Sequence, residues 1–298
     1  MVWAVTSGWT VAGSSPASAA AAAGDVISTV AGGGAMTAPP NGAAATAEML
    51  GQPLDATVDR SGNIVVADQN DNVIRVVAGS TGTFYGRAMS RGALYTVVGT
   101  GTANYTGDGG PAAAATLWGP NGVVVDSAGD LIITDTGNNE VRFVPRATGV
   151  YFGLFMTAGD IYDIAGNAQS SGYAGDGGQA TAALMSSPDG LALDPQGNLL
   201  VADTGNDVVR LVGNHAGPDL GVAVTPGDIY TVAGNGNFGY SGDGGPAAAA
   251  TLNLQSFSGV ATDAQGDLIL ADGGNSVVRM VAAQSGSYAT MPVTAGDI

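Results

Sequence analysis

Short apolar runs separated by polar turns recur along the chain from residue 24 onward. The clearest turn is "ADTGNDVVR" at 202–210, which returns as "ADQNDNVIR" at 67–75, "TDTGNNEVR" at 134–142 and "ADGGNSVVR" at 271–279. Runs rich in Val, Ile and Leu that are bounded by Gly, Asn and Asp are typical of β-strands joined by tight turns. Their return at steps of 67, 68 and 69 residues indicates a repeat architecture.

Each repeat contains four such runs, which we name a, b, c and d in chain order. In the second repeat they are "GVVVD" (122–126), "DLIITD" (130–135), "VRFV" (141–144) and "DIAG" (163–166). Four antiparallel strands form one small sheet, and several sheets arranged radially form a β-propeller with strand a nearest the axis. We therefore predict an all-β fold, a β-propeller of four antiparallel four-stranded blades around 54–99, 122–166, 190–234 and 259–298 plus 24–32.

The run "GVVVDSAGDLIITDTGNNEVRFV" resembles the NHL repeat. The segment "GYSGDGGPAAAATL" is similar to the one that often precedes strand a in the secreted bacterial and teneurin NHL-like members of that family. The resemblance covers residues 24–298 and implies a propeller, but it implies little about activity. The period is longer than the usual length of roughly 40–45 residues, and only four copies are present. We expect the extra length in a c–d hairpin arm, as at 145–162, and in a d–a connection whose Ala-rich part forms one helical turn.

The two ends of the repeat region overlap in type. The chain starts with a d-like run, "GDVISTVAG" (24–32), and stops at "TAGDI" (294–298), where the next d strand should begin. One interpretation is that residues 26–31 pair with Val277–Val281 and complete the last blade, which leaves no open sheet edge. The other is that this chain is part of a longer propeller.

Composition narrows the class of partner. The net charge is −17, all eight basic residues are Arg, and cysteine is absent. So acidic a chain repels phosphate backbones, which argues against nucleic acid as a partner, and without cysteine there are no disulfides or thiolate metal sites. No apolar run after the N-terminal region reaches the roughly 20 residues that span a bilayer.

The first 23 residues differ from the repeats. Their moderately apolar stretch and the following small residues resemble a secretory signal without its basic start, and the alternative is a disordered Ala/Ser/Gly tail. The signal-like interpretation predicts an extracellular or cell-surface protein. We expect it to be a monomer with no membrane span.

Acidic side chains gather on one predicted rim, where b–c turns and d–a connections emerge together. Asp and Asn in such turns commonly bond to nearby backbone, so the favoured interpretation is structural. In this interpretation one Asp per blade caps its own b–c turn: Asp68, Asp135, Asp203 and Asp272. One Arg per blade pairs with an acidic or carbonyl partner between blades: Arg75, Arg142, Arg210 and Arg279. Oxygen clusters also suit Ca²⁺, which makes Asp108, Asp176 and Asp243 weaker calcium candidates; no other cofactor is expected.

The residues give catalysis little support. Amidating lyases of the NHL fold hold zinc with several histidines, whereas this chain has only His215. Lactonase-like propellers hold Ca²⁺ at the axis, but the strand a runs offer no shared interior acid, and Glu48 and Glu140 lie outside them. The favoured function is a non-catalytic secreted binding or scaffold module whose loops engage a protein or a glycan. The alternative is a Ca²⁺-dependent hydrolase or lyase with an axial site, which would require acidic side chains to converge on the axis.

Overall fold

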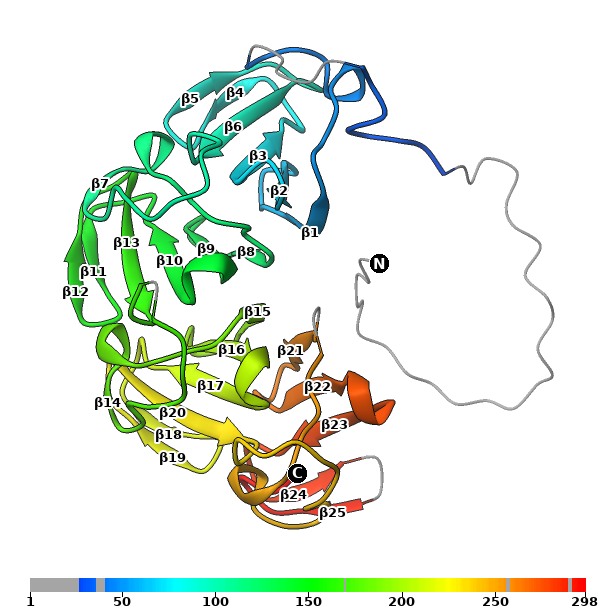
Figure 1. Cartoon of the computed structure of the whole chain (residues 1–298), viewed down its shortest axis with the longest axis vertical. Coiled ribbons are helices and arrows are strands. Elements are labelled where there is room, and N and C mark those ends of the chain that lie inside the picture. The colour runs from blue at the N-terminus through cyan, green and yellow to red at the C-terminus, as the bar shows by residue number, and fades with distance from the viewer. Residues whose placement is uncertain (1–26, 36–40, 169, 256–257, 289–290) are drawn as a thin grey trace.

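The computed structural model describes residues 27–35, 41–168, 170–255, 258–288 and 291–298. The signal-like segment 1–23 lies outside the described residues. The described chain forms four β-sheet blades that follow one another in an arc around one axis (Figure 1). The predicted all-β propeller of four antiparallel blades is therefore confirmed. Helical residues in the described chain are confined to short 3-10 turns.

The innermost strand of each blade is strand a, as predicted (Figure 1). These strands are β1 (Pro53–Val58), β8 (Val123–Val125), β15 (Pro188–Leu193) and β21 (Val260–Thr262). Strands b and c follow outward as antiparallel hairpins: β2 (Ile64–Asp68), β9 (Leu131–Asp135), β16 (Leu199–Asp203) and β22 (Leu268–Asp272), then β3 (Val73–Val77), β10 (Glu140–Val144), β17 (Val208–Val212) and β23 (Val277–Val281). Three blades have a strand d: β6 (Leu94–Val98), β13 (Asp160–Ala165) and β20 (Asp228–Ala233).

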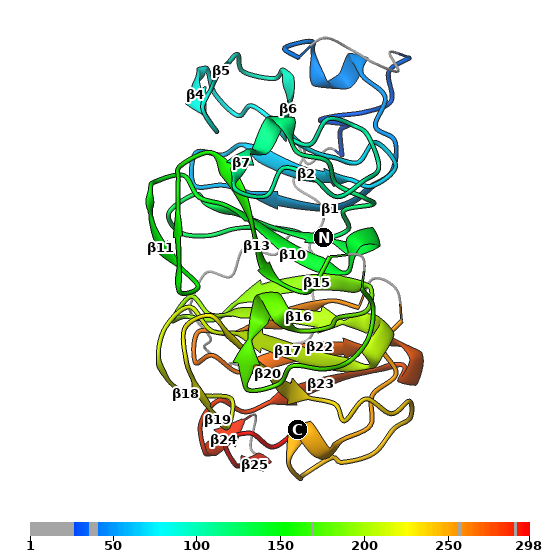
Figure 2. The same ribbon diagram turned by 60° about the vertical axis from the view of Figure 1, so that its left-hand side comes forward.

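Both predicted sites of extra length are present. Each c–d connection forms a two-stranded arm: β4 (Gly82–Phe84) with β5 (Arg87–Met89), β11 (Gly149–Tyr151) with β12 (Leu154–Met156), β18 (Gly217–Asp219) with β19 (Val222–Val224), and β24 (Gly286–Tyr288) with β25 (Met291–Val293). The Ala-rich part of each d–a connection forms a 3-10 turn: η1 (Ala45–Ala47), η2 (Ala112–Ala114), η4 (Ala180–Ala182) and η6 (Ala247–Ala249). Just before two of these turns, the short strands β7 (Gly110–Pro111) and β14 (Gly178–Gln179) pair with β13 and β20 (Figure 1). Figure 2 shows β7 and β13 from another side.

Three of the b–c turns contain a second set of 3-10 turns: η3 (Thr136–Asn138), η5 (Thr204–Asn206) and η7 (Gly273–Asn275). The residue after each turn adopts the left-handed conformation, as Asn139 does with φ of 60°. Asn, Asp and Ser occupy these positions, and short polar side chains tolerate this conformation better than most non-glycine residues do. The turn sequence therefore determines how strand b reverses into strand c.

The hydrophobic core lies between blades. One cluster joins Val65 and Ile74 of the first blade to Leu117 and Ile133 of the second, and similar clusters join the second blade to the third and the third to the fourth. Because each sheet buries apolar side chains against its neighbours, the blades stabilise one another pairwise.

The predicted closure by residues 26–31 is wrong for residues 27–31, and residue 26 lies outside the described residues. The N–H of Gly32 donates to the Ala45 carbonyl at 3.0 Å, and Ala31 packs against a cluster of the first blade. Within the described residues, β23 pairs only with β22, so the last blade has three strands. The chain thus forms an open arc whose first and last blades lie at opposite ends (Figure 1).

Candidate functional site

A buried arginine in each blade organises the predicted acidic rim. Arg210 is fully buried, and its guanidinium lies 2.7 Å from Asp176 and 3.5 Å from Asp203. The same arrangement joins Arg142 to Asp108 and Asp135, and Arg279 to Asp243 and Asp272. In the first blade Arg75 keeps the equivalent partner Asp68 and contacts Asp71 and Glu48 in place of the second aspartate. Each arginine therefore fastens the d–a connection that leads into a blade to the b–c hairpin of that blade.

The recurring Asp that follows strand b accepts its backbone hydrogen bond from a different segment than predicted. Asp203 Oδ1 accepts the N–H of Ser186 at 2.7 Å, and Ser186 lies just before strand a rather than in the b–c turn. Asp68, Asp135 and Asp272 do the same with Gln52, Trp118 and Asn253. The prediction of backbone capping within the turn is wrong, because the carboxylate points across the blade to the incoming chain.

The turn itself contributes a side chain to this carboxylate. The Asn206 amide donates to Asp203 Oδ2 at 2.8 Å, and Asn138 donates to Asp135 at 2.9 Å. Burial raises the pKa of Asp135 and of Asp203 to about 6, although these hydrogen bonds and the neighbouring arginine act in the opposite direction. The recurring carboxylates are thus fully buried rather than displayed on the rim.

The three calcium candidates are arranged alike around these arginines. Asp108, Asp176 and Asp243 each face one guanidinium, and an aromatic ring covers the same group: Tyr105, Tyr173 and Tyr240 lie 5.2, 5.3 and 5.2 Å from Arg142, Arg210 and Arg279. Each of these carboxylates therefore already has a cationic partner, while about half of its surface remains exposed. Within the described residues, no group of three or more His, Asp or Glu side chains is placed to hold a metal ion.

The axis carries acidic residues that the sequence interpretation missed. A cavity of about 200 Å³ is lined by all four strand a segments and includes Asp55, Asn121 and Asp189. Asp55 Oδ2 accepts the N–H of Val123 at 2.9 Å, which joins the first two blades. The prediction that the strand a runs share no acid holds for the aligned "GVVVD" runs. Asp55 and Asp189 lie near the start of their strands, at positions that are not equivalent between blades.

The second blade departs from the other three around its arginine. Glu140 takes the position held by Val73, Val208 and Val277, and Asp163 takes the position held by Thr96 and Thr231. Glu140 is completely buried, and neither carboxylate oxygen has a hydrogen-bond partner among the described residues. Burial, with Asp163 nearby, raises the pKa of Glu140 to about 9. The second blade thus keeps the structural network and adds two acids to it.

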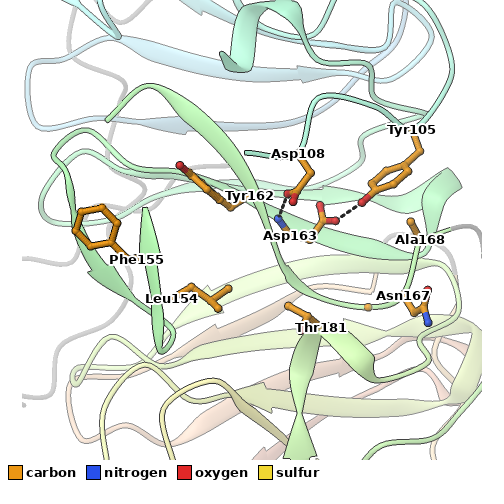
Figure 3. A pocket seen from close by; sticks show the side chains of 10 residues that line it. Tyr105, Asp108, Leu154, Phe155, Tyr162, Asp163, Asn167, Ala168 and Thr181 are labelled. Carbon is orange, nitrogen blue, oxygen red and sulfur yellow. Dashed lines mark hydrogen bonds between the residues drawn. The ribbon is translucent and has the colours of Figure 1, made fainter. Parts of the chain in front are cut away.

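Beside these residues lies a groove of about 600 Å³ between the second and third blades (Figure 3). Tyr105, Asp108 and Asp163 line one part of it, and Leu154 and Phe155 of β12 line the other. The Tyr105 hydroxyl donates to Asp163, and Asp163 Oδ1 lies 2.7 Å from Arg142 Nε. Asp108 accepts the Asp163 N–H at 2.7 Å, which places both carboxylates at the groove wall.

The groove has an apolar side that is open to solvent. Phe155 is 71% exposed, and its equivalents in the other arms are Ala88, Ala223 and Pro292. An aromatic ring that is exposed in one arm and absent from the other three serves no role common to the blades. A comparison of the four copies for departures, rather than for shared residues, would have found Phe155, Asp163 and Glu140 in the sequence.

The arrangement can bind a polar ligand with an apolar face. Asp108 offers a carboxylate oxygen as an acceptor, as does Oδ2 of Asp163, which also accepts the Tyr105 hydroxyl. Asn167 and Thr181 add amide and hydroxyl groups elsewhere in the groove (Figure 3). The single histidine, His215, is exposed on the opposite rim and lies outside this groove. No helix in the described part of the chain is long and apolar enough to cross a membrane.

Three solved structures of Bacteroides thetaiotaomicron proteins share the fold. A putative phosphatase matches with a TM-score of 0.52 and 16% identity over 79% of this chain and 49% of its own. A structural genomics protein of unknown function matches with a TM-score of 0.51 and 16% identity, over 76% of this chain and 46% of its own. An auxiliary nutrient binding protein matches with a TM-score of 0.50 and 15% identity, again over 76% of this chain and 46% of its own. The chain thus spans about half the length of each.

Sequence comparison identifies the repeat directly. The model of the NHL repeat matches residues 117–142, which run from the entry to β8 into β10. Human teneurin-1 is 33% identical over 107 residues, which are 33% of this chain and 4% of teneurin-1. The second blade thus contains an NHL-type repeat, and the described chain forms a four-bladed β-propeller.

Proposed function

We propose that this chain is a non-catalytic, secreted binding module that takes a glycan in the groove between its second and third blades. The main support is that Phe155 and Asp163 both line this groove, and these are residues in which the second blade differs from the other blades. Positions that recur in every blade maintain the fold, whereas these two add an exposed ring and a carboxylate on a rigid frame.

The chemistry of the groove suits a sugar. Pyranose rings have an apolar face that packs on aromatic side chains, and their hydroxyls donate to carboxylates such as those of Asp108 and Asp163. The volume of about 600 Å³ lies within the range of about 300–1,000 Å³ that is usual for ligand sites. The fold similarity to a nutrient binding protein is compatible with a binding role but reflects the fold alone.

The direct test is a glycan array probed with the purified chain, followed by calorimetric titration of the tightest glycan. Phe155→Ala and Asp163→Thr install the residues of the third blade, so both should fold normally and weaken binding at least about tenfold, or about 1.4 kcal/mol. Phe238→Ala is the matched control, since Phe238 is 75% exposed in a different connection. Unchanged affinity in both groove variants would contradict the proposal, as would capture of a protein partner without any glycan signal.

Secretion is proposed on the signal-like residues 1–23. Expression of the complete chain in a bacterial host that exports proteins should yield a processed form outside the cytoplasm. Retention of an unprocessed chain in the cytoplasm would contradict this part of the proposal.

A further inference from the structure

The third blade also departs from the repeat, in the segment that faces the second blade across the groove. The 3-10 turn that leads into this blade has the sequence "GQATA" at 178–182, whereas the second and fourth blades have "GPAAA" at 110–114 and 245–249. Gln179 is found in the third blade alone, and Thr181 is shared only with Thr46 of the first blade. Thr181 lines the groove (Figure 3). Departures from two neighbouring blades therefore meet at one interface.

The groove adjoins a second cavity along the same interface. This second cavity has a volume of about 200 Å³, and Leu154 and Thr181 line both it and the groove (Figure 3). Its volume is below the roughly 300 Å³ at which ligand sites usually begin. The second cavity therefore suits an extension of a ligand that is held in the groove, rather than a separate ligand.

The walls of the second cavity are apolar on one side and polar on the other. Phe152 and Ile164 of the second blade line it and are buried. Gln179, Thr181 and Asp228 of the third blade supply an amide, a hydroxyl and a carboxylate. Among the described residues, the side chains of Gln179 and Thr181 have no hydrogen-bond partner, and both residues are exposed. These two side chains are therefore available to the hydroxyls of a ligand.

The charges along both spaces favour a ligand without acidic groups. The linings contain the carboxylates of Asp108, Asp163 and Asp228, and they contain no His, Lys or Arg. Arg142 pairs with the first two of these aspartates but is itself fully buried. A carboxylate or sulfate on the ligand would be repelled by the three aspartates, whereas ligand hydroxyls can donate to all of them.

We propose, building on the proposed glycan site, that this interface binds an oligosaccharide of at least two units without acidic groups, rather than a single sugar. One unit lies against Phe155 in the groove, and the next unit enters the second cavity past Leu154. Gln179 and Thr181 contact this next unit, so the third blade determines the length of glycan that is bound.

The two side chains can be replaced while the backbone is kept. Gln179 has φ of −55° and ψ of 123°, and Pro111 of the second blade has the same values. Gln179 pairs with Asp228 at the blade edge, as Pro111 does with Asp160. Gln179→Pro combined with Thr181→Ala therefore installs the residues of the second blade at a position whose φ suits proline.

Calorimetric titration with sugars of increasing length tests the proposal. The probes are β-1,4-linked glucose, α-1,4-linked glucose and β-1,4-linked N-acetylglucosamine, each as one to four units. In at least one series the affinity of the unmodified chain should rise at least about fivefold between one unit and three, because two side chains gain hydrogen bonds. The double variant should lose this rise and keep the affinity for one unit. Phe155→Ala should weaken every length, since Phe155 lines the groove but not the second cavity.

Pro111→Gln with Ala113→Thr is the matched control. It places the same two side chains beside an arm that has Ala88 where the second blade has Phe155, so all affinities should stay unchanged. Equal affinity for all lengths, or a rise that survives in the Gln179→Pro, Thr181→Ala variant, would overturn this inference and leave the proposed function standing. Failure of all three series to bind would also overturn it, and the glycan array would then decide the proposed function independently.

Discussion

Replacement of Asp203 by Ala tests the buried network that fastens each blade. Asp203 is completely buried, accepts the Ser186 N–H and the Asn206 amide, and lies 3.5 Å from Arg210. Its loss leaves the partly buried N–H of Ser186 without its acceptor, which costs about 1–3 kcal/mol. It also leaves Arg210 with Asp176 as its remaining acidic partner. Part of that second cost is offset, because the raised pKa of Asp203 shows that its own charge is buried unfavourably. We expect a net loss of about 2–3 kcal/mol of unfolding free energy.

Asp176→Ala is the matched comparison, because it removes a carboxylate from the same guanidinium. The Asp176 side chain is 45% exposed, so the pair that it forms is screened by solvent and should be worth at most about 1 kcal/mol. Urea denaturation at neutral pH, followed by circular dichroism, gives both values from the midpoint and the slope. Equal losses in the two variants, or a loss below about 1 kcal/mol for Asp203→Ala, would refute the assignment of the anchoring role to the buried acid.

Three further outcomes follow from the same structure. Glu140→Gln should stabilise the protein increasingly as pH rises from about 4.5 towards about 9, because folding raises the pKa of Glu140 and its ionised form is therefore penalised in the folded state. If the difference in unfolding free energy between this variant and the unmodified chain stays flat across this window, the burial argument is contradicted. Gly190→Ala should cost roughly 1–3 kcal/mol of unfolding free energy through its clash with the Ser258 carbonyl, whereas Gly259→Ala should leave the stability of the chain unchanged. Thermal melting of dilute samples compares the two variants. Equal effects would show that the close approach of adjacent strands a is unimportant. Millimolar calcium should not raise the melting temperature, because an arginine already faces each of Asp108, Asp176 and Asp243; a rise that is lost on replacing Asp176 and Asp243 would establish a metal site.

The fold could be predicted because each blade repeats its local signals. Alternation of short Val- and Leu-rich runs with "ADTGN"-type turns specified strands a to c and their order, and the repeated "TVAG" specified strand d. The c–d arms and the 3-10 turns were also predictable, since both lie in segments of fixed composition between those runs. Periodicity carries such information because residues with the same neighbours in every blade meet the same physical demands.

The partners of the buried acids could not be predicted. Asp203 and Ser186 are 17 residues apart, and nothing local to the b–c turn indicates that the carboxylate points across the blade. Closure could not be predicted either, because the likeness of residues 29–32 to the end of a strand d does not indicate which blade they contact, and in the structure Gly32 donates to Ala45 beside the first blade. The groove does not follow from the repeat pattern for a different reason: Phe155 and Asp163 are not shared by the blades but differ from the residues at the same positions in the other copies.

The most direct test of the proposed function is a crystal structure of the chain with the tightest glycan from the array. We expect a sugar ring stacked against Phe155, with hydroxyls within hydrogen-bond distance of Asp108 and Asp163 Oδ2. A ligand bound instead at the axis, beside Asp55 and Asp189, would contradict it and would favour the axial site of the alternative function.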